Sequence, residues 1–313
     1  MKLKKPKFWD YQKPNLTSNI LLPISKIVYF ISKLNKKKKT FSDIKSICVG
    51  NIYIGGTGKT SLSIELKKIF DKKNIKCCFI KKKYSNQLDE QTLLKKYGKT
   101  FVERSRIKAL EKAIAEKYQV AIFDDGLQDK NISYDLTFVC FNQKNMIGNG
   151  RLIPSGPLRE ELDSLKKNKN VFLIGNDKNN SQLKELLLKE NPFLNFYDAL
   201  YKPSNLENID KHKDYVVFSG IGNHVTFVDM LNKNKIKILK DFEFPDHYNY
   251  SENDLREIQT EAMKHNANIL TTKKDYLRID TKYQKEILFI DVCLDIHQID
   301  HLEKKLNFLN ENN

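Results

Sequence analysis

The stretch Cys48-Val-Gly-Asn-Ile-Tyr-Ile-Gly-Gly-Thr-Gly-Lys-Thr-Ser61 decides the fold class of this chain. The apolar run at residues 45–49 predicts a buried parallel strand, and residues 61–70 have the periodicity of a helix. The glycines between them predict a turn with few side chains, so that backbone N–H groups at the start of the helix can surround an anion. The sequence therefore predicts a cradle for a nucleoside triphosphate.

The residues of this cradle have distinct expected roles. Lys59 would bring a positive charge to the β- and γ-phosphates, and the Thr60 hydroxyl would reach Mg²⁺. The strict spacing of the motif is not met, because Tyr53 stands where its first glycine is expected. We assign nucleotide binding to one continuous segment, which consists of Gly55, Gly56, Thr57, Gly58, Lys59, Thr60 and Ser61.

Length and composition limit the possible classes of protein. The chain has 313 residues, of which 40% are hydrophobic, so it can form two ordinary domains with real cores. Its net charge is +16, yet only six of its 55 basic residues are arginine. This lysine excess, without an aromatic stacking motif, argues against a nucleic-acid partner and suits an anionic membrane surface or a phosphorylated substrate.

Apolar runs alternate with helical patterns along most of the chain. This alternation predicts α/β architecture, with a parallel sheet covered by helices on both faces. A second α/β run begins at Asp214, and we expect the domain boundary near residues 178–200. The sequence contains no internal repeat.

Residues 20–34 predict an amphipathic helix before the cradle. Isoleucines and a valine fill one side, while a seven-residue repeat places polar residues on the other: Ser25, Lys26, Ser32 and Lys33. Pro23 would fit the first turn. The stretch is too short to cross a bilayer, and its basic flanks favour the surface of an anionic membrane. The alternative is a helix that packs on its own domain.

Several polar constellations follow the cradle. An apolar strand at residues 120–123 ends in Asp124 and Asp125, where an acidic side chain of a P-loop enzyme binds Mg²⁺ directly or through water. We therefore assign metal binding to Thr60, Asp124 and Asp125. Gln128 follows closely, and the glycine- and proline-rich loop at residues 148–160 carries two arginines suited to a phosphorylated substrate. Asp89-Glu90 alone would be interpreted as a solvated loop, and a lone His247 as structural.

Together these segments resemble the tetraacyldisaccharide 4′-kinase family of lipid A synthesis. The resemblance rests on segments in order over nearly the whole chain: the N-terminal apolar helix, V-G-N-I-Y-I-G-G-T-G-K-T, Asp89-Glu90, D-D-G-L-Q, G-N-G-R-L-I-P-S-G-P-L-R-E and F-P-D-H-Y. Two further stretches fit as well, Phe218-Ser-Gly-Ile-Gly-Asn223 and Leu270-Thr-Thr-Lys-Lys-Asp275. The joint signal is more specific than any one motif.

The resemblance implies a fold and a division of the chain. It implies two α/β/α domains with the active site in the cleft between them, the first a P-loop NTPase-like parallel sheet preceded by the amphipathic helix. We expect a membrane-associating segment at residues 1–40, a P-loop kinase domain at 41–190 and a smaller α/β domain at 191–313 that closes the cleft. The protein is expected to be a monomer at the cytoplasmic face of the bacterial inner membrane.

The resemblance also implies a reaction. ATP with Mg²⁺ would phosphorylate the 4′-hydroxyl of tetraacyldisaccharide 1-phosphate, a lipid A disaccharide precursor, to give lipid IVA. Asp89 would be the general base and His247 its partner, with Lys59 as the third catalytic residue. The expected substrate-binding residues are Tyr84, Glu90, Gln128, Arg159 and Glu160.

The chain departs from the family pattern at several positions. The family usually has S-R-G-Y-G after the second strand, whereas this chain has Lys81-Lys82-Lys83-Tyr84-Ser85. Three other positions also differ, namely Gln91 for proline, Asp129 for histidine and Lys273 for glutamate. These changes bear on phosphate contacts and substrate tolerance and leave the expected catalytic residues in place.

Two other functions were weighed. A membrane-associated P-loop ATPase switch of the partitioning type would use a similar cradle, but such proteins usually carry a further lysine where this chain has Ile54. A small-molecule kinase acting on a soluble substrate is disfavoured by the basic, amphipathic N-terminus.

Overall fold

The computed structural model describes residues 5–33, 38–84, 88–175, 180–222 and 224–307. Ser85, Asn223 and residues 34–37, which carry parts of the patterns above, lie outside these ranges. The described residues form two compact units. The P-loop unit comprises residues 5–84, 94–200 and 295–307, and the C-terminal unit comprises residues 88–93 and 201–294. The expected division at residues 40 and 190 stays a prediction.

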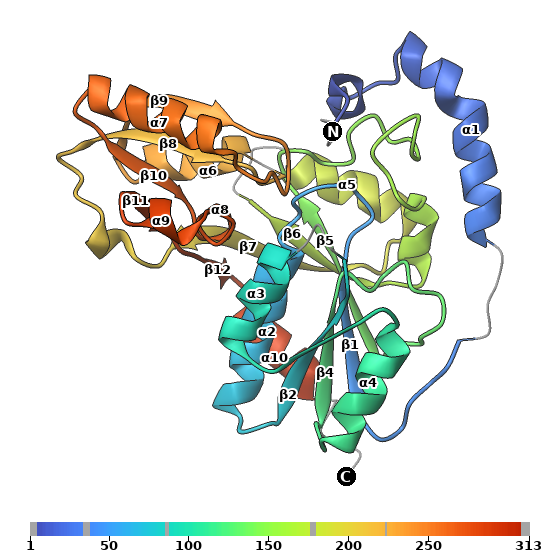
Figure 1. The fold of residues 1–313 in the computed structure, drawn as a ribbon. Helices are drawn as coiled ribbons and strands as arrows, with labels where there is room; N and C mark the ends of the chain where they lie inside the picture. Colours follow the sequence, from blue (N-terminus) through green and yellow to red (C-terminus); the bar gives the residue numbers. More distant parts are fainter. Residues whose placement is uncertain (1–4, 34–37, 85–87, 176–179, 223, 308–313) are drawn as a thin grey trace. The chain divides into compact units, whose positions relative to one another are not determined.

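One eight-stranded sheet organises the P-loop unit, in the order β12-β7-β6-β5-β1-β4-β2-β3 (Figure 1). Its strands are β1 (Lys45–Gly50), β2 (Cys77–Lys82), β3 (Thr100–Glu103), β4 (Val120–Asp124), β5 (Leu136–Asn142), β6 (Asn170–Ile174), β7 (Asn195–Pro203) and β12 (Val292–Ile296). From β3 to β7 every neighbouring pair is parallel. The carboxyl ends of β1 and β4 therefore lie side by side, with Val49 opposite Asp124.

Alternating side chains of these strands pack against helices. The helices of the P-loop unit are α1 (Leu16–Lys33), α2 (Lys59–Lys72), α4 (Arg106–Ala115), α5 (Asn180–Glu190) and α10 (Ile299–Asn307). The helix α3 (Leu88–Tyr97) contributes residues 88–93 to the C-terminal unit and residues 94–97 to the P-loop unit. α2 contacts β1, β2 and β4, and α4 contacts β2 and β3. The alternate residues Cys78 and Ile80 of β2 share one buried cluster with Ala109 and Leu110 of α4. This packing arises because every second side chain of the strand points to the same face of the sheet, where it meets the apolar face of the helix.

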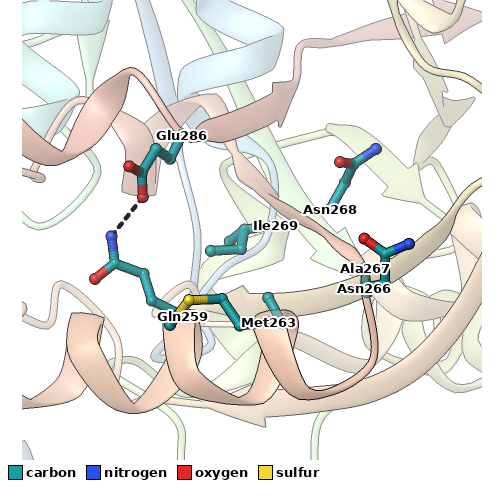
Figure 2. A pocket seen from close by; sticks show the side chains of 8 residues that line it. Gln259, Met263, Asn266, Ala267, Asn268, Ile269 and Glu286 are labelled. Atoms are coloured by element: carbon teal, nitrogen blue, oxygen red, sulfur yellow. Dashed lines mark hydrogen bonds between the residues drawn. The ribbon is translucent and has the colours of Figure 1, made fainter.

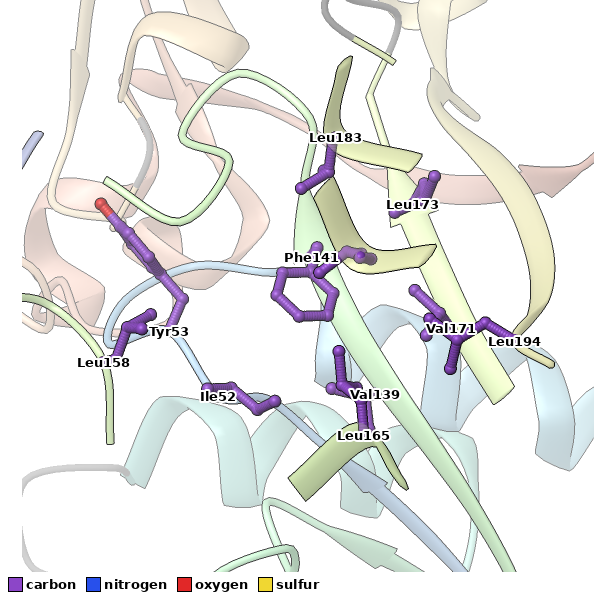
Figure 3. Close-up of a cluster of buried hydrophobic side chains, with 11 residues drawn as sticks. Ile52, Tyr53, Val139, Phe141, Leu158, Leu165, Val171, Leu173, Leu183 and Leu194 are labelled. Carbon is purple, nitrogen blue, oxygen red and sulfur yellow. The ribbon is translucent and has the colours of Figure 1, made fainter. Parts of the chain in front are cut away.

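A second buried cluster supports the other half of this sheet (Figure 3). Val139 and Phe141 of β5 and Val171 of β6 are fully buried in it. Ile52 and Tyr53, which follow β1 directly, lie in the same cluster. The turn that leads toward the cradle is therefore fixed at its start by core packing.

The C-terminal unit has its own parallel sheet, in the order β11-β10-β8-β9. The strands are β8 (Asp214–Ser219), β9 (Lys237–Glu243), β10 (Asn268–Thr272) and β11 (Ile287–Ile290), and the helices are α6 (His224–Lys233), α7 (Glu252–Lys264), α8 (Lys273–Tyr276) and α9 (Thr281–Gln284). Tyr215 and Val217 of β8 pack with residues of α6, while Val216 and Phe218 pack with residues of α7. The two helices thus cover opposite faces, as expected for an α/β/α layer.

The N-terminal helix α1 packs on its own unit through serines. The Ser18 hydroxyl donates to the carbonyl of Ser155 (2.6 Å), and the Ser25 hydroxyl donates to that of Leu152 (2.9 Å). Trp9 lies beside them, and its indole N–H donates to the carbonyl of Pro154. The apolar face points away from these contacts, because its residues are exposed: Leu16, Ile20, Ile24, Ile27, Val28, Phe30 and Ile31.

Three local expectations were wrong. The helix begins at Leu16, so Pro23 lies inside it and not in its first turn. Asp89 and Glu90 lie in the first turn of α3 and not in a loop, because the leucines of residues 88–94 continue as a half-buried helix. No strand was expected at β7, whose polar residues and lysine weaken the strand pattern; its pairing with β6 overrides that local sequence.

We expect Gly50→Ala to destabilise the P-loop unit. A Cβ atom at Gly50 would lie 2.4 Å from Cβ of Leu127, so the two backbones must move apart. The expected cost is about 1–3 kcal/mol of unfolding free energy, measured by urea denaturation. Gly98→Ala is the matched control, because its Cβ would meet only the flexible end of the Lys67 side chain. Equal effects of the two substitutions would contradict the close approach.

Candidate active site

The glycine-rich turn ends in a helix whose first N–H groups are left for a ligand. Gly58 precedes α2 with a φ of 83°, a left-handed conformation that favours glycine, and no side chain caps the helix there. The hydroxyl of Thr57 is buried and has no hydrogen-bond partner among the described residues. Uncapped amides and an orphaned hydroxyl beside Lys59 match what the triphosphate of a nucleotide needs.

The carboxylate of Asp125 contacts two basic side chains, those of Arg159 and Lys59. Its carboxylate oxygen Oδ1 accepts from Nη1 of Arg159 at 2.9 Å and lies 3.7 Å from Nζ of Lys59. The same Arg159 nitrogen also lies 3.3 Å from the amide oxygen of Gln128. The amide nitrogen of Gln128 in turn donates to a carboxylate oxygen of Glu160 (3.1 Å). Contacts thus link Lys59, Asp125, Arg159, Gln128 and Glu160 into one chain of polar side chains, which the sequence motifs predicted only separately.

Asp124 occupies a more enclosed position than Asp125. Its Oδ2 accepts from Nζ of Lys81 at 2.7 Å and from the Thr60 hydroxyl at 3.2 Å. Its Oδ1 lies 3.5 Å from the Ser63 hydroxyl. The side chains of Lys81 and Asp124 are 1% and 0% exposed, so they form a buried ion pair. In the sequence, Lys81 is recognisable only as part of a departure from the family pattern, and no motif predicts this pair.

The donor chemistry of the P-loop unit fits Mg²⁺. Thr60, Asp124 and Asp125 offer hydroxyl and carboxylate oxygens, the hard ligands that Mg²⁺ prefers. Phosphate oxygens and waters usually complete such a site. When bound, Mg²⁺ would supply charge neutralisation at the β- and γ-phosphates.

A second polar cluster lies in the C-terminal unit, around Asp89. Nδ1 of His247 lies 3.1 Å from Oδ1 of Asp89, although the two residues are 158 positions apart in the sequence. Nη2 of Arg278 donates to the other oxygen, Oδ2, at 2.6 Å. Glu90 is close as well, since its Oε1 lies 3.5 Å from Nζ of Lys274. The side chain of Asp89 is 2% exposed, so its few contacts determine its charge.

These contacts keep Asp89 ionised. Burial alone would raise the pKa of its carboxyl, but the hydrogen bond with His247 and the charges of Arg278 and Lys274 hold that pKa well below its usual range. Burial prevails at Glu160, whose pKa is raised although the hydrogen bond from Gln128 and the charge of Lys130 lower it. The two carboxyl groups are therefore suited to different tasks.

Two candidate residues have strained backbones. Asp125 and His247 have φ values of 61° and 56°, in the left-handed region that non-glycine residues seldom adopt. Each is held by a backbone hydrogen bond: the N–H of Asp125 donates to Val49, and that of His247 donates to Gly220. Strain of this kind costs on the order of 1 kcal/mol and is concentrated at functional sites.

Sequence reasoning missed Arg278 and Arg106. Nη1 of Arg278 donates to the buried carboxylate of Asp275 (2.8 Å), so the arginine links Asp275 to Asp89. Arg106 donates to the carbonyl of Asp125 and pairs with Asp129 at 3.2 Å. Their scarcity, six in 55 basic residues, was the available signal, because arginine suits buried ion pairs better than lysine.

The remaining candidates are less informative. Ser61 lies in the first turn of α2, and Tyr84 is 36% exposed with Nζ of Lys82 5.5 Å from its ring centre. Asp89, Glu90 and His247 belong to the C-terminal unit, whereas the other candidates belong to the P-loop unit. The expectation of a cleft site stays a prediction.

The C-terminal unit also contains a groove that is lined by other residues (Figure 2). It is bordered by the end of α7 and the start of β10, and its one carboxylate, Glu286, accepts a hydrogen bond from Gln259 (2.8 Å). Asp275 follows the opposite end of β10. The groove contains none of the candidate residues, so it is not the predicted site.

The parallel sheet, the glycine-rich turn before α2 and the strand-end carboxylates define a P-loop nucleotide-binding protein. The sequence pattern of the family described as tetraacyldisaccharide-1-P 4′-kinase matches residues 17–100 and 86–310. The chain therefore belongs to the tetraacyldisaccharide 4′-kinase family.

Curated relatives and a solved structure agree with this membership. The chain is 55% identical over 314 residues to a tetraacyldisaccharide 4′-kinase of Pelagibacter ubique, covering 100% of both chains. It is 35% identical to the protein of the same name from Rickettsia akari, covering 98% of this chain and 97% of the relative. The fold is similar to LpxK from Aquifex aeolicus, crystallised in complex with ATP, with a TM-score of 0.70, 22% identity, and coverage of 94% and 99%.

We expect Arg278→Gln to raise the pKa of Asp89. The variant keeps the burial that raises this pKa and loses a charge that lowers it, so the expected shift is about one unit or more. The measurement is the carboxyl carbon chemical shift of Asp89 against pH by NMR. Arg278→Lys, which keeps the charge, should shift the pKa less. An unchanged titration in a folded Arg278→Gln protein would contradict the assigned cause.

Proposed function

We propose that Asp89, partnered by His247, orients the acceptor hydroxyl and accepts its proton during phosphoryl transfer from ATP. Family membership makes the chain a kinase, and it transfers the γ-phosphoryl group to the 4′-hydroxyl of tetraacyldisaccharide 1-phosphate, giving lipid IVA. The observation that carries the assignment is the 3.1 Å contact between His247 and a buried, ionised Asp89.

The low pKa of Asp89 agrees with this role in a loose transition state. A weakly basic carboxylate orients the hydroxyl in the ground state and need not remove its proton before the bond to the leaving group has largely broken. Positioning and charge neutralisation then carry most of the rate. Lys59 supports this second task, since it lies at the start of α2 beside Asp125.

The proposed roles of the other candidates follow from their contacts. Thr60 and Asp125 would hold Mg²⁺, and the segment Gly55 to Ser61 would hold the phosphates. Arg159 pairs with Asp125, so it is close to the transferred group and suits phosphate binding. Gln128 and Glu160 are fixed by their mutual hydrogen bond and would orient the substrate. We further infer that Tyr84 and Glu90 contact the acceptor.

We also propose that α1 attaches the protein to an anionic membrane surface. In the described ranges, no helix combines the length and apolar character needed to cross a membrane. The seven apolar residues of α1 are 43–75% exposed, and exposed lysines flank them, including Lys7, Lys13, Lys38 and Lys39. Apolar residues beside basic ones suit lipid acyl chains and anionic headgroups together. The acceptor lipid would be met at the cytoplasmic face of the inner membrane.

Asp89→Asn should separate catalysis from nucleotide binding. The asparagine keeps the shape but cannot accept the proton, so kcat should fall about 10²–10⁴-fold while ATP affinity changes little. The measurement is transfer from γ-labelled ATP to purified tetraacyldisaccharide 1-phosphate, with ATP binding followed by calorimetry. Asp246→Asn, an exposed neighbour of His247, is the matched control and should retain activity. Near-normal turnover in the Asp89 variant would remove that residue from the mechanism. Hydrolysis of ATP without labelled lipid would instead favour the ATPase switch.

The membrane contact can be tested by substitutions on one helix face. The triple variant with Ile20, Ile24 and Ile27 changed to Ser should lose flotation with vesicles of anionic phospholipid, because each isoleucine contributes about 1.5–3 kcal/mol on burial. The chain should stay folded, since these side chains are 50–68% exposed. This test is sharper than deleting residues 1–39, which would also remove Trp9 and the two serines. Phe193→Ser, which removes a 75% exposed side chain elsewhere, is the control. Unchanged flotation of the triple variant would reject the anchor.

A further inference from the structure

The buried pair of Lys81 and Asp124 bears on how the metal enters the nucleotide site. Lys81 lies next to Asp124 because β2 and β4 are parallel neighbours. Their register places Ile80 opposite Phe123, and Lys81 and Asp124 are the next residues of the two strands. The ammonium group lies 2.7 Å from Oδ2 of Asp124, which is also the oxygen nearest the Thr60 hydroxyl. A cation of the chain itself therefore occupies the place where a divalent metal would bind that oxygen.

The charges around the turn disfavour a free metal ion. In the described ranges, three cations, Lys59, Lys81 and Arg159, form ion pairs with two carboxylates, Asp124 and Asp125. A divalent ion added alone would be repelled at short range in a site that water screens poorly. The phosphates of ATP would reverse this balance, because they bring several negative charges into the same place.

We propose that Lys81 is an internal counter-cation that keeps divalent metal off Asp124, so that Mg²⁺ enters only together with a nucleotide. Asp124 then acts through Thr60: it accepts a hydrogen bond from the Thr60 hydroxyl and so orients it. Asp124 is not a direct ligand of the metal. Direct contacts come from Thr60, from Asp125 and from the phosphates. The proposal rests on the nucleotide site of the proposed function and is independent of the lipid acceptor.

The test measures metal binding and not turnover. Mn²⁺ serves as the probe, and its free concentration is followed by electron paramagnetic resonance with and without adenylyl imidodiphosphate, an ATP analogue that is not hydrolysed. The full-length protein should bind Mn²⁺ weakly alone and much more tightly with the analogue. Lys81→Met should bind Mn²⁺ alone about tenfold or more tightly than the unaltered protein, because the repelling charge is gone.

The double variant Lys81→Met/Asp124→Asn separates the two residues. It removes both charges of the buried pair, which avoids leaving one of them uncompensated. It should return the binding of Mn²⁺ alone to the level of the unaltered protein and keep binding with the analogue within a few-fold. Lys67→Met is the matched control, because Lys67 is also buried but pairs with Asp71 on α2, two turns beyond Lys59. It should leave both affinities unchanged.

Two results would overturn the proposal. The first is a folded Lys81→Met protein, checked by thermal melting, whose affinity for Mn²⁺ alone does not rise. The second is a double variant that loses binding of Mn²⁺ with the analogue about a hundredfold, which would make Asp124 a direct ligand. If the single variant does not fold, the double variant decides. Failure to phosphorylate the lipid would reject the proposed acceptor and would leave these metal affinities as they are.

Discussion

The carboxylate of Asp124 is the contact on which the P-loop unit depends. It is fully buried at the end of β4, and it receives the ammonium of Lys81 from β2 and the hydroxyl of Thr60 from the first turn of α2. One buried charge thus fixes two strands and a helix start relative to each other. Removing either charged partner alone would leave the other uncompensated, at a cost of about 3–5 kcal/mol. The geometry of the phosphate-binding turn is therefore built into the stability of the fold.

The C-terminal unit holds the buried carboxylate of Asp89 in a comparable way. Arg278 is bound by Asp275, by the carbonyl of Gly220 and by Asp89, so the carboxylate of Asp89 is attached to a rigid frame. Tyr250 and Thr272 donate to Asp275 and complete the frame. Burial raises the pKa of Asp275 in spite of these donors, whereas the pKa of Asp89 is lowered. Two acidic residues that share one arginine thus differ in their tendency to hold a proton.

Patterns of hydrophobicity predicted most of the architecture. The strands at residues 45–49 and 120–123 and the helix at 61–70 agree with the structure to within a few residues, because each carries a clear hydrophobic pattern. β7 and the start of α3 could not be predicted, since pairing and packing with distant residues stabilise them. The individual site residues were recognisable from motifs, and the family resemblance paired Asp89 with His247, but the contact of Asp89 with Arg278 was not recognisable. Arg278 is 189 positions away, and no local pattern relates the two residues. Two other residues that differ from the family pattern also form ion pairs: Asp129 pairs with Arg106, and Lys273 pairs with Asp291.

The inward-facing serines of α1 contact a segment of backbone that also reaches the turn after β1. Ser18 and Ser25 hold Ser155, and four residues later Arg159 contacts Asp125. Between these points the backbone pairs with the turn after β1, through Ile54 to Pro157 and Arg159 to Ile52. A short stretch of backbone, residues 155–159, therefore connects the contacts of the surface helix with those of the turn after β1. The attachment of the surface helix and the position of Arg159 therefore depend on the same few residues of backbone.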